Sequence, residues 1–474
     1  MAQQALSRAA GAPLISGNTV DLLIDAAANY AAWLKAIRTA QHRVLLENYI
    51  IRDDAVGREF RNALIERAKA GVTVAVITDW AGCLGQSRSR FWQPLRAAGG
   101  QVHIFNPPQL GEPLGWISRD HRKLLVVDGT KGFLSGVCIS AKWLGDASRN
   151  VPPWRDTGVA VEGPAVAEIE AAFAQSWQLF GTPLPIFSAN AEPYEPTGTT
   201  DVRIIATQPT SASIYRLDQL IAAMASKTLW LTDAYFVGVS PYVQALVSAA
   251  RDGVDVRLLV PGSSDIPVVA GMSRAGYRPL LKAGIRVFEW NGSMLHAKTA
   301  VADGQWARVG SSNLNIASWL GNYEIDVAVE NATFAGELAA QYERDLENAT
   351  EIVLVSRKRR NHTSDRVRSS EHRPPRVRKD GGSSSRAAVG ALRIANSVGA
   401  ALGNRRVLGD TSIGPMLAGI AALIAVVVIA LLWPAVIAWP CAVIAAWFAL
   451  NLAIQGWRLR RRGQRNAPAS AESE

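Results

Sequence analysis

The sequence predicts an α/β protein made of two pseudo-symmetric halves, each with helices on both faces of its sheet. Three observations carry this prediction: segments repeat in the same order, short apolar strands alternate with amphipathic helices, and a proline-rich stretch separates the two copies. With 474 residues, of which 49% are hydrophobic, the chain is long enough to form two or three domains with real cores.

The repeat covers four segments in each copy. Residues 43–50, 70–77, 95–105 and 120–129 match residues 227–236, 252–260, 281–288 and 295–304. Alternation such as Val72, Val74 and Val76 indicates strands, and Ala-Gly pairs mark helix ends. Strand–helix–strand units with right-handed crossovers then predict an α/β sheet in each half. We expect halves at 15–180 and 201–355, joined by the linker 181–200, with matching strand ends converging on one cleft.

A set of three polar residues occurs once in each half at a constant offset of 175 residues. The candidate catalytic residues are His121, Lys123 and Asp128 in the first half, and His296, Lys298 and Asp303 in the second. Residues two apart on a strand share a face, so each His–Lys pair points the same way. Imidazole can attack phosphorus or protonate a leaving alkoxide, and lysines can neutralise the non-bridging oxygens. A single copy would be weak evidence, whereas a doubled one indicates a phosphodiester site.

Small polar residues near each copy predict phosphate contacts. Residues 310–313 form a Gly-Ser-Ser-Asn turn that matches residues 135–138. We therefore expect phosphate binding or support from Gly136, Ser311, Ser312 and Asn313. An acid also recurs, as Asp156 and Glu324, and such a carboxylate can fix the tautomer of a histidine. The alternative for these two acids is a salt bridge at the start of a strand.

Together these motifs resemble the phospholipase D superfamily, and within it the bacterial cardiolipin synthases. The resemblance covers about residues 15 to 350, and it rests on 121–129, 295–304 with 310–314, 46–50 and 154–156. It departs from the family pattern at Cys138, where Asn is expected, and at Ser135, where Gly is expected. Because every His and Lys is present, this departure suggests a tuned site rather than an inactive one.

The resemblance implies two-step chemistry without a metal or other cofactor. It makes His121 the nucleophile that forms a phosphohistidine, and His296 the acid and base. Asp128 and Asp303 are expected to orient the local backbone and the lysines rather than to touch substrate. The implied substrate is a phospholipid, with phosphatidylglycerol as the expected donor and acceptor.

Composition restricts the setting of this chemistry. The net charge of +10 suits an anionic partner, either a nucleic acid or an acidic membrane surface. The 3 cysteines form neither a disulfide framework nor a zinc pattern, which fits a reducing cytoplasmic compartment. The first 20 residues lack the apolar core of a secretory signal.

The C-terminal part predicts membrane attachment. Residues 356–386 read as a basic disordered linker, and 387–408 as a short interfacial helix. Residues 413–456 are uncharged and apolar and predict a transmembrane helical hairpin, followed by a basic and then polar tail at 457–474. Basic residues flank both ends of the hairpin, so the positive-inside rule places both ends, and the catalytic halves, on the cytoplasmic side of a bacterial inner membrane. A buried hairpin in a soluble domain is the alternative.

Four functions fit the residues to different degrees. Phosphatidyl transfer between two phosphatidylglycerol molecules, forming cardiolipin, fits best. A hydrolytic phospholipase D differs only in using water as acceptor, a choice that depends on cleft shape. A nuclease would use the basic linker to bind nucleic acid, but the predicted hairpin argues against a nucleic-acid partner. A non-enzymatic tether would be expected to have lost parts of its motifs.

Overall fold

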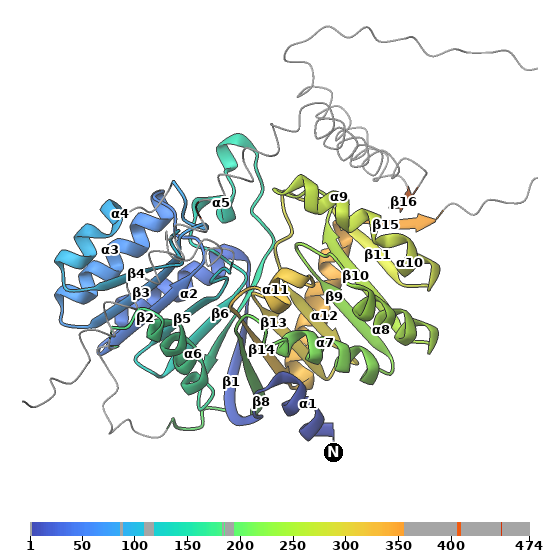
Figure 1. The fold of residues 1–474 in the computed structure, drawn as a ribbon, viewed down its shortest axis with the longest axis horizontal. Helices are drawn as coiled ribbons and strands as arrows, with labels where there is room; N and C mark the ends of the chain where they lie inside the picture. Colours follow the sequence, from blue (N-terminus) through green and yellow to red (C-terminus); the bar gives the residue numbers. More distant parts are fainter. Residues whose placement is uncertain are drawn as a thin grey trace, which may run out of the picture.

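The computed structural model describes residues 2–85, 89–108, 118–182, 184, 194–354, 405–408 and 447. Among these residues, sixteen strands form one continuous sheet that bends into two lobes (Figure 1). Strands β1 (Ile15–Ile24) and β8 (Thr200–Thr207) pair antiparallel between the lobes. From this central pair the strands follow in the same order on each side, which confirms two α/β halves.

The first half contains six further strands, in the spatial order β7-β6-β5-β2-β3-β4 from the centre outward. They are β2 (Arg43–Asn48), β3 (Thr73–Asp79), β4 (Gln101–Phe105), β5 (Lys123–Val127), β6 (Lys131–Ser135) and β7 (Thr157–Glu162). Its helices are α2 (Asp25–Thr39), α3 (Ala55–Lys69), α4 (Ser89–Ala97), α5 (Ala141–Leu144) and α6 (Val166–Gln178), with a 3₁₀ turn at Ala147–Arg149.

The second half repeats this order as β14-β13-β12-β9-β10-β11 and extends it by β15 and β16. Its strands are β9 (Thr228–Thr232), β10 (Asp255–Pro261), β11 (Arg286–Trp290), β12 (Thr299–Ala302), β13 (Trp306–Gly310), β14 (Glu324–Glu330), β15 (Ala349–Leu354) and β16 (Arg405–Leu408). The helices are α7 (Ser213–Met224), α8 (Ser240–Arg251), α9 (Pro267–Ala275), α10 (Tyr277–Lys282), α11 (Ile316–Leu320) and α12 (Ala332–Glu347).

The sheet is mixed rather than built only from strand–helix–strand units. β2, β3 and β4 are parallel, as are β9, β10 and β11, and helices connect them as predicted. The strands nearer the centre are antiparallel, which the sequence reasoning did not anticipate. Asp128 (φ 54°) and Gly129 (φ 71°) both adopt the left-handed conformation of a tight hairpin turn, so β5 returns directly as β6. Asp303 and Gly304 make the same turn between β12 and β13.

Helices cover both faces of each half, as predicted. Leu45 and Leu46 of β2 enter two different clusters because neighbouring residues on a strand face opposite sides. One cluster packs beneath α2, α3 and α4. The other is shared by both halves and includes residues of α6 and α12. Because this shared core joins the halves, their central strands are fixed relative to each other.

The N-terminal helix α1 (Ala2–Ala10) belongs to the second half by packing. Leu6 and Ala10 lie in the same cluster as residues of α7, α8 and α10. Residues 2–10 thus pack on the second half, whereas the chain from residue 15 onward forms the first half, where the sequence predicted its start.

Most of the predicted C-terminal features lie outside the described residues. These are the linker 356–386, the tail 457–474 and, apart from residue 447, the hairpin 413–456. Of the interfacial helix predicted at 387–408, the structure describes 405–408 and finds strand β16, parallel to β15, in place of helix. Within the described ranges, no helix combines the length and the apolar character needed to cross a membrane.

Candidate active site

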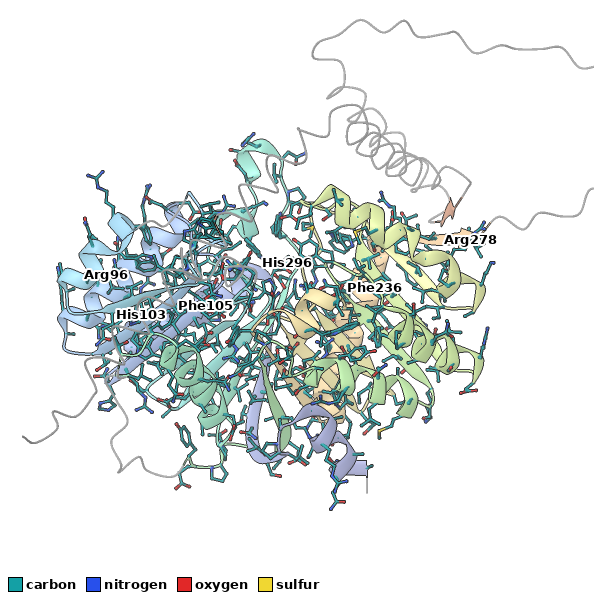
Figure 2. The ribbon with its side chains drawn as sticks, viewed as in Figure 1. Arg96, His103, Phe105, Phe236, Arg278 and His296 are labelled. Atoms are coloured by element: carbon teal, nitrogen blue, oxygen red, sulfur yellow. The ribbon has the colours of Figure 1, made fainter. Side chains whose placement is uncertain are left out.

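The two candidate histidines lie where the halves meet. His121 lies two residues before the start of β5, and His296 lies three residues before the start of β12. His296 lies between the two lobes (Figure 2). His121 is 9% exposed and His296 is 4% exposed, so the surrounding protein, more than water, determines the protonation of both rings. The structure thus brings the two copies of the motif to one place.

Each histidine is bonded to an acid from the opposite half. His121 Nδ1 lies 2.8 Å from Glu324 Oε2, and His296 Nδ1 lies 2.8 Å from Asp156 Oδ2. Both carboxylates are completely buried. We call these two contacts the crossed pairs. Because an ionised carboxylate only accepts hydrogen bonds, each Nδ1 carries the proton and donates it, which leaves Nε2 as the basic nitrogen.

Backbone contacts between the halves produce the crossing. His121 N donates to Tyr323 O at 2.9 Å, next to Glu324 in the chain. His296 N donates to Arg155 O at 2.7 Å, next to Asp156. The chain before β5 therefore runs alongside the chain before β14, and the chain before β12 runs alongside the chain before β7. Glu324 and Asp156, each next in sequence to an accepting carbonyl, then place their carboxylates against the histidine rings.

A second donor holds each carboxylate, and the two donors differ. Ser311 Oγ donates to Glu324 Oε2 at 2.6 Å. Trp143 Nε1, on α5, donates to Asp156 Oδ2 at 2.9 Å. The Trp143 ring also meets His296 edge-on, with a centroid separation of 5.3 Å. The site is therefore symmetric in its histidines and asymmetric in what supports them.

The electrostatics favour neutral histidines beside ionised acids. Burial lowers the pKa of His296 to about 4, with Lys298 adding to the effect and Asp156 opposing it. Burial also lowers the pKa of His121, opposed by Glu324. Burial raises the pKa of Asp156, but His296 and Lys298 outweigh it and bring the pKa down to about 2. At neutral pH both rings can therefore offer an unprotonated Nε2.

The two lysines of the motif are buried beside the histidines. Lys123 Nζ donates to His121 O at 2.6 Å, and Lys298 Nζ donates to His296 O. Burial lowers the pKa of Lys298 to about 8, and the charge of Lys123 contributes to this lowering. This repulsion of Lys298 by Lys123 indicates that the ammonium groups of the two halves face one site. An anion that binds between them would relieve this repulsion.

The aspartates of the motif do not reach the site, which corrects their place among the catalytic candidates. Asp128 accepts hydrogen bonds from the backbone N–H groups of residues 41, 42 and 43 at 2.7–2.8 Å. Asp303 accepts from those of residues 226, 227 and 228 at 2.7–2.9 Å. Both lie in the hairpin turns at the far ends of β5 and β12. They orient the local backbone, as expected, but no contact joins them to the lysines.

The predicted phosphate-contacting residues mostly hold the acids instead. Ser311 bonds to Glu324, and Ser312 Oγ donates to Asp326, a partner of Arg308 at 2.7 Å. A Cβ at Gly136 would lie 2.2 Å from Asp156 Oδ1, so the absence of a side chain makes room for this carboxylate.

Asn313 is the member of this set with free hydrogen-bonding capacity. The residue is 4% exposed, and its Oδ1 has no hydrogen-bond partner among the described residues. The matching residue of the first half, Cys138, is buried, and burial raises the pKa of its thiol to about 11. The thiol is therefore neutral, and one side of the site lacks the carboxamide that the other side has.

Sequence reasoning missed several aromatic residues of the site. Tyr49 lies edge-on to His121 at a centroid distance of 4.9 Å, and Tyr235 to His296 at 5.8 Å. Trp154 also packs on His296, at 5.7 Å. The repeat had already paired Tyr49 with Tyr235, and that pairing could have identified them. Trp143 also has a counterpart, because Ala-Lys-Trp-Leu-Gly at 141–145 matches Ala-Ser-Trp-Leu-Gly at 317–321, and this match could have identified it.

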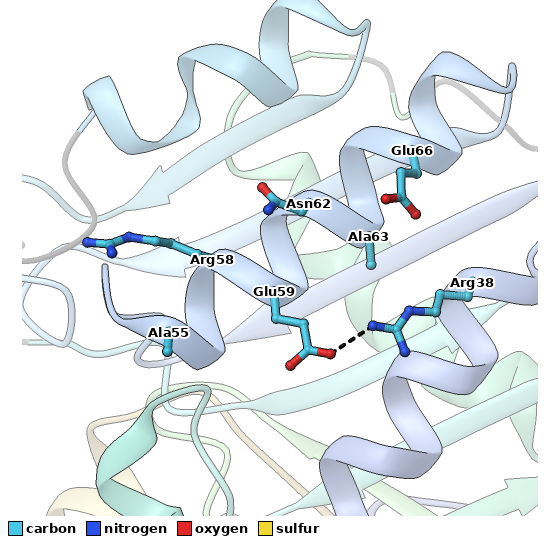
Figure 3. A pocket seen from close by; sticks show the side chains of 7 residues that line it. All are labelled: Arg38, Ala55, Arg58, Glu59, Asn62, Ala63 and Glu66. Atoms are coloured by element: carbon cyan, nitrogen blue, oxygen red, sulfur yellow. Dashed lines mark hydrogen bonds and ion pairs between the residues drawn. The ribbon is translucent and has the colours of Figure 1, made fainter.

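A hollow away from the histidines shows a different chemistry. A surface groove of about 300 Å³ between α2 and α3 contains the Arg38–Glu59 ion pair and none of the candidate residues (Figure 3). Among the described residues, no group of three or more His, Cys, Asp or Glu side chains is arranged to hold a metal ion. The histidine site remains the candidate active site.

Comparison with known proteins agrees with this geometry. Residues 33–177 and 218–347 match the family model described as "Cardiolipin synthase, PLD-like domain". The chain is 33% identical over 365 residues to cardiolipin synthase A of Pseudomonas aeruginosa, which covers 75% of this chain and 72% of that protein. It is 30% identical over 368 residues to cardiolipin synthase 1 of Bacillus cereus, with 75% and 72% covered.

Among solved structures, the fold is similar to that of phosphatidylserine synthase from Haemophilus influenzae. The TM-score is 0.59 at 14% identity, covering 74% of this chain and 91% of that chain. This likeness concerns the fold alone. The matched family model and the curated relatives together establish that the chain belongs to the phospholipase D-like family of cardiolipin synthases.

Proposed function

We propose that the protein is a cardiolipin synthase, a phosphatidyltransferase that joins two phosphatidylglycerol molecules and releases glycerol. The observation that carries this proposal is the pair of crossed His–carboxylate contacts, placed beside two buried lysines. The names of the relatives support the phospholipid substrate and the transferase reaction.

In the first step, His121 Nε2 attacks the phosphorus of one phosphatidylglycerol. The P–O bond to the glycerol headgroup breaks, and His296 delivers a proton to the departing alkoxide. Glu324 stabilises the positive charge that develops on the His121 ring, because its carboxylate accepts the Nδ1–H bond at 2.8 Å. Lys123 and Lys298 neutralise the non-bridging oxygens, where negative charge builds up.

In the second step, His296 removes a proton from a hydroxyl of a second phosphatidylglycerol. The resulting oxygen attacks phosphorus, the P–N bond to His121 breaks, and cardiolipin is released. Substrate binding prepares His296 for its acid role. The phosphodiester anion offsets the ammonium charge of Lys298, which contributes to the low pKa of this histidine in the free site.

The deciding experiment uses vesicles that contain labelled phosphatidylglycerol, with EDTA present. Wild type is compared with His121→Ala and His296→Ala. Cardiolipin and free glycerol from wild type alone would support a synthase that needs both histidines and no divalent metal. Phosphatidic acid without cardiolipin would instead identify a hydrolase. If no phospholipid is consumed, the lipid function is wrong, and phosphodiesters of nucleic acids become the substrates to test.

The proposed setting is the cytoplasmic face of a bacterial inner membrane. Support comes from the sequence of residues 413–456, which predicts a transmembrane hairpin, and from the basic residues on both sides of it. The full chain should remain with membranes after an alkaline carbonate wash, and a chain that ends at residue 412 should be released. Release of the full chain would contradict the hairpin.

A further inference from the structure

Exposed apolar side chains border the candidate site on three loops that come from both halves. The first loop follows β3 in the first half, the second is the excursion between β6 and β7, and the third leads into α9 in the second half. We call this set the apolar rim: Leu84, Leu144, Val151, Ile266, Val268 and Met272. Val268 is 73% exposed and Met272 is 53% exposed, four residues apart on one face of α9.

The excursion between β6 and β7 projects from the fold as a closed loop. Asp146 and Val151 exchange two backbone hydrogen bonds of 2.8 and 2.9 Å, which hold the loop in one shape. Leu144 and Val151 lie on this loop. The residues at its base, Trp143 and Trp154, both contact the His296 ring. This part of the apolar rim is therefore attached directly to the candidate site.

The rim on the second half is connected to the same ring. Tyr235, which packs on His296, donates its hydroxyl to Asp265 Oδ1 at 2.7 Å. Asp265 immediately precedes Ile266 and also pairs with Lys142 of α5 at 3.5 Å. α5 and α9 accordingly lie close together, and they occupy the same edge of the molecule (Figure 1).

The first half contributes its part of the rim through Tyr49. This ring packs on His121, and the Cys83 thiol lies 3.7 Å from the Tyr49 carbonyl oxygen. Leu84 follows Cys83 and is 62% exposed. All three parts of the rim thus lie one or two contacts from a candidate catalytic histidine.

An apolar set of this kind on one side of a protein indicates a partner. Two cations lie next to the apolar side chains of the excursion: Arg149 is exposed, and Lys142 keeps 42% of its side chain exposed while it pairs with Asp265. Apolar tips with cations beside them match the chemistry of an anionic bilayer surface, where side chains enter the acyl boundary and cations meet the headgroups. We propose that the apolar rim inserts into the surface of an anionic phospholipid bilayer, so that the site opens onto the headgroup layer. The proposal rests on the proposed phospholipid substrate.

The first test separates docking from chemistry. The full chain is reconstituted in vesicles as wild type, Val268→Asp and Met272→Asp. Met224→Asp is the matched control, because Met224 is 43% exposed at the end of α7 and lines a hollow with Asp303, at the far end of β12. Each protein is assayed on long-chain phosphatidylglycerol in the bilayer and on dihexanoyl phosphatidylglycerol, which dissolves as single molecules.

We expect both rim variants to lose about tenfold or more of their activity on bilayer lipid, since a charge must then enter the acyl boundary. Their activity on the dissolved substrate should stay within twofold of wild type, and Met224→Asp should match wild type on both. Unchanged activity on bilayer lipid would overturn the proposal. Equal losses on both substrates would also overturn it, because the change would then act on the site itself.

A second measurement does not depend on turnover. A fluorophore is attached at Val268→Cys or Met224→Cys in a Cys441→Ser background, since Cys83 and Cys138 are buried. Lipids with a quencher near the headgroup should quench the label at position 268 and leave the label at 224 unchanged. Absence of quenching at 268 overturns the docking proposal. Quenching at 268 together with inactive wild type would retain the docking surface and overturn the proposed function.

Discussion

The crossed pairs make a prediction that distinguishes the two acids by reaction step. Asp156 belongs to the first half but supports His296, whereas Glu324 supports His121. Replacing each with its amide keeps the shape and removes the charge. A hydrogen bond to a charged group contributes about 1.5–3 kcal/mol, which corresponds to a factor of about 10 to 150 in rate. The pKa of Asp156 is lowered to about 2 although burial raises it, because the attraction of this carboxylate to His296 and Lys298 exceeds the cost of burial.

The assay uses a phosphatidyl p-nitrophenyl ester, whose leaving group departs without a proton. Wild type should release one p-nitrophenolate per site in a burst and then turn over more slowly. Asp156→Asn should keep the burst and slow the steady state by about 10- to 150-fold, because His296 then activates the acceptor poorly. Glu324→Gln should slow the burst itself by a similar factor. Asp252→Asn, at the exposed end of α8, is the matched control and should behave as wild type.

The trapped intermediate identifies the nucleophile. Asp156→Asn is quenched with denaturant and kept at neutral to alkaline pH, because the P–N bond of a phosphohistidine hydrolyses in acid. Mass spectrometry should then find the phosphatidyl group on the peptide that contains His121. A modified His296 peptide would refute the assignment of roles. A burst lost in Asp156→Asn and kept in Glu324→Gln would refute the reasoning that each acid serves the histidine of the opposite half.

Four further changes test the supports of the site. Trp143→Phe removes the donor to Asp156 and should reduce kcat about threefold to tenfold. The acidic limb of the pH–rate profile should move to higher pH, because the Asp156 carboxylate becomes more basic without this donor. Gly136→Ala places a Cβ 2.2 Å from Asp156 Oδ1 and should reduce kcat about tenfold while KM changes little, measured by steady-state kinetics. Asp128→Asn should cost about 2–3 kcal/mol in the free energy of unfolding, measured with urea, because the charge on three backbone N–H bonds is lost. Finally, a histidine with a pKa of about 4 when folded and about 6.5 when unfolded makes the free energy of unfolding fall by about 2 kcal/mol between pH 7 and 4.5. This contribution should appear as the difference between wild type and His296→Gln in urea titrations at the two pH values, because the other titrating groups are the same in both proteins.

Much of the fold followed from local patterns. Short apolar strands such as 72–77 and the helices between them predicted the parallel part of each half, because strand–helix–strand units with right-handed crossovers place their strands parallel. The antiparallel part was missed, although its signal is visible in the Asp128-Gly129 and Asp303-Gly304 pairs, which are typical of tight hairpins. The prediction of helix for residues 405–408 was wrong, because these residues pair with β15 as strand β16. A short segment takes its conformation from its neighbours as much as from its own residues.

The sequence by itself determined the candidate residues for the chemistry and the family. The constant offset of 175 between the two copies of His, Lys and Asp singled out the candidates, and residues two apart on a strand share a face, which placed each His beside its Lys. Only the tertiary structure decided how they combine. The spacing of two residues on one strand shows whether their side chains share a face. The contact between His121 and Glu324, however, spans 203 residues and depends on how the halves are joined. The backbone contacts of His121 with Tyr323 and of His296 with Arg155 fix that join, and they give each histidine its acid from the opposite half.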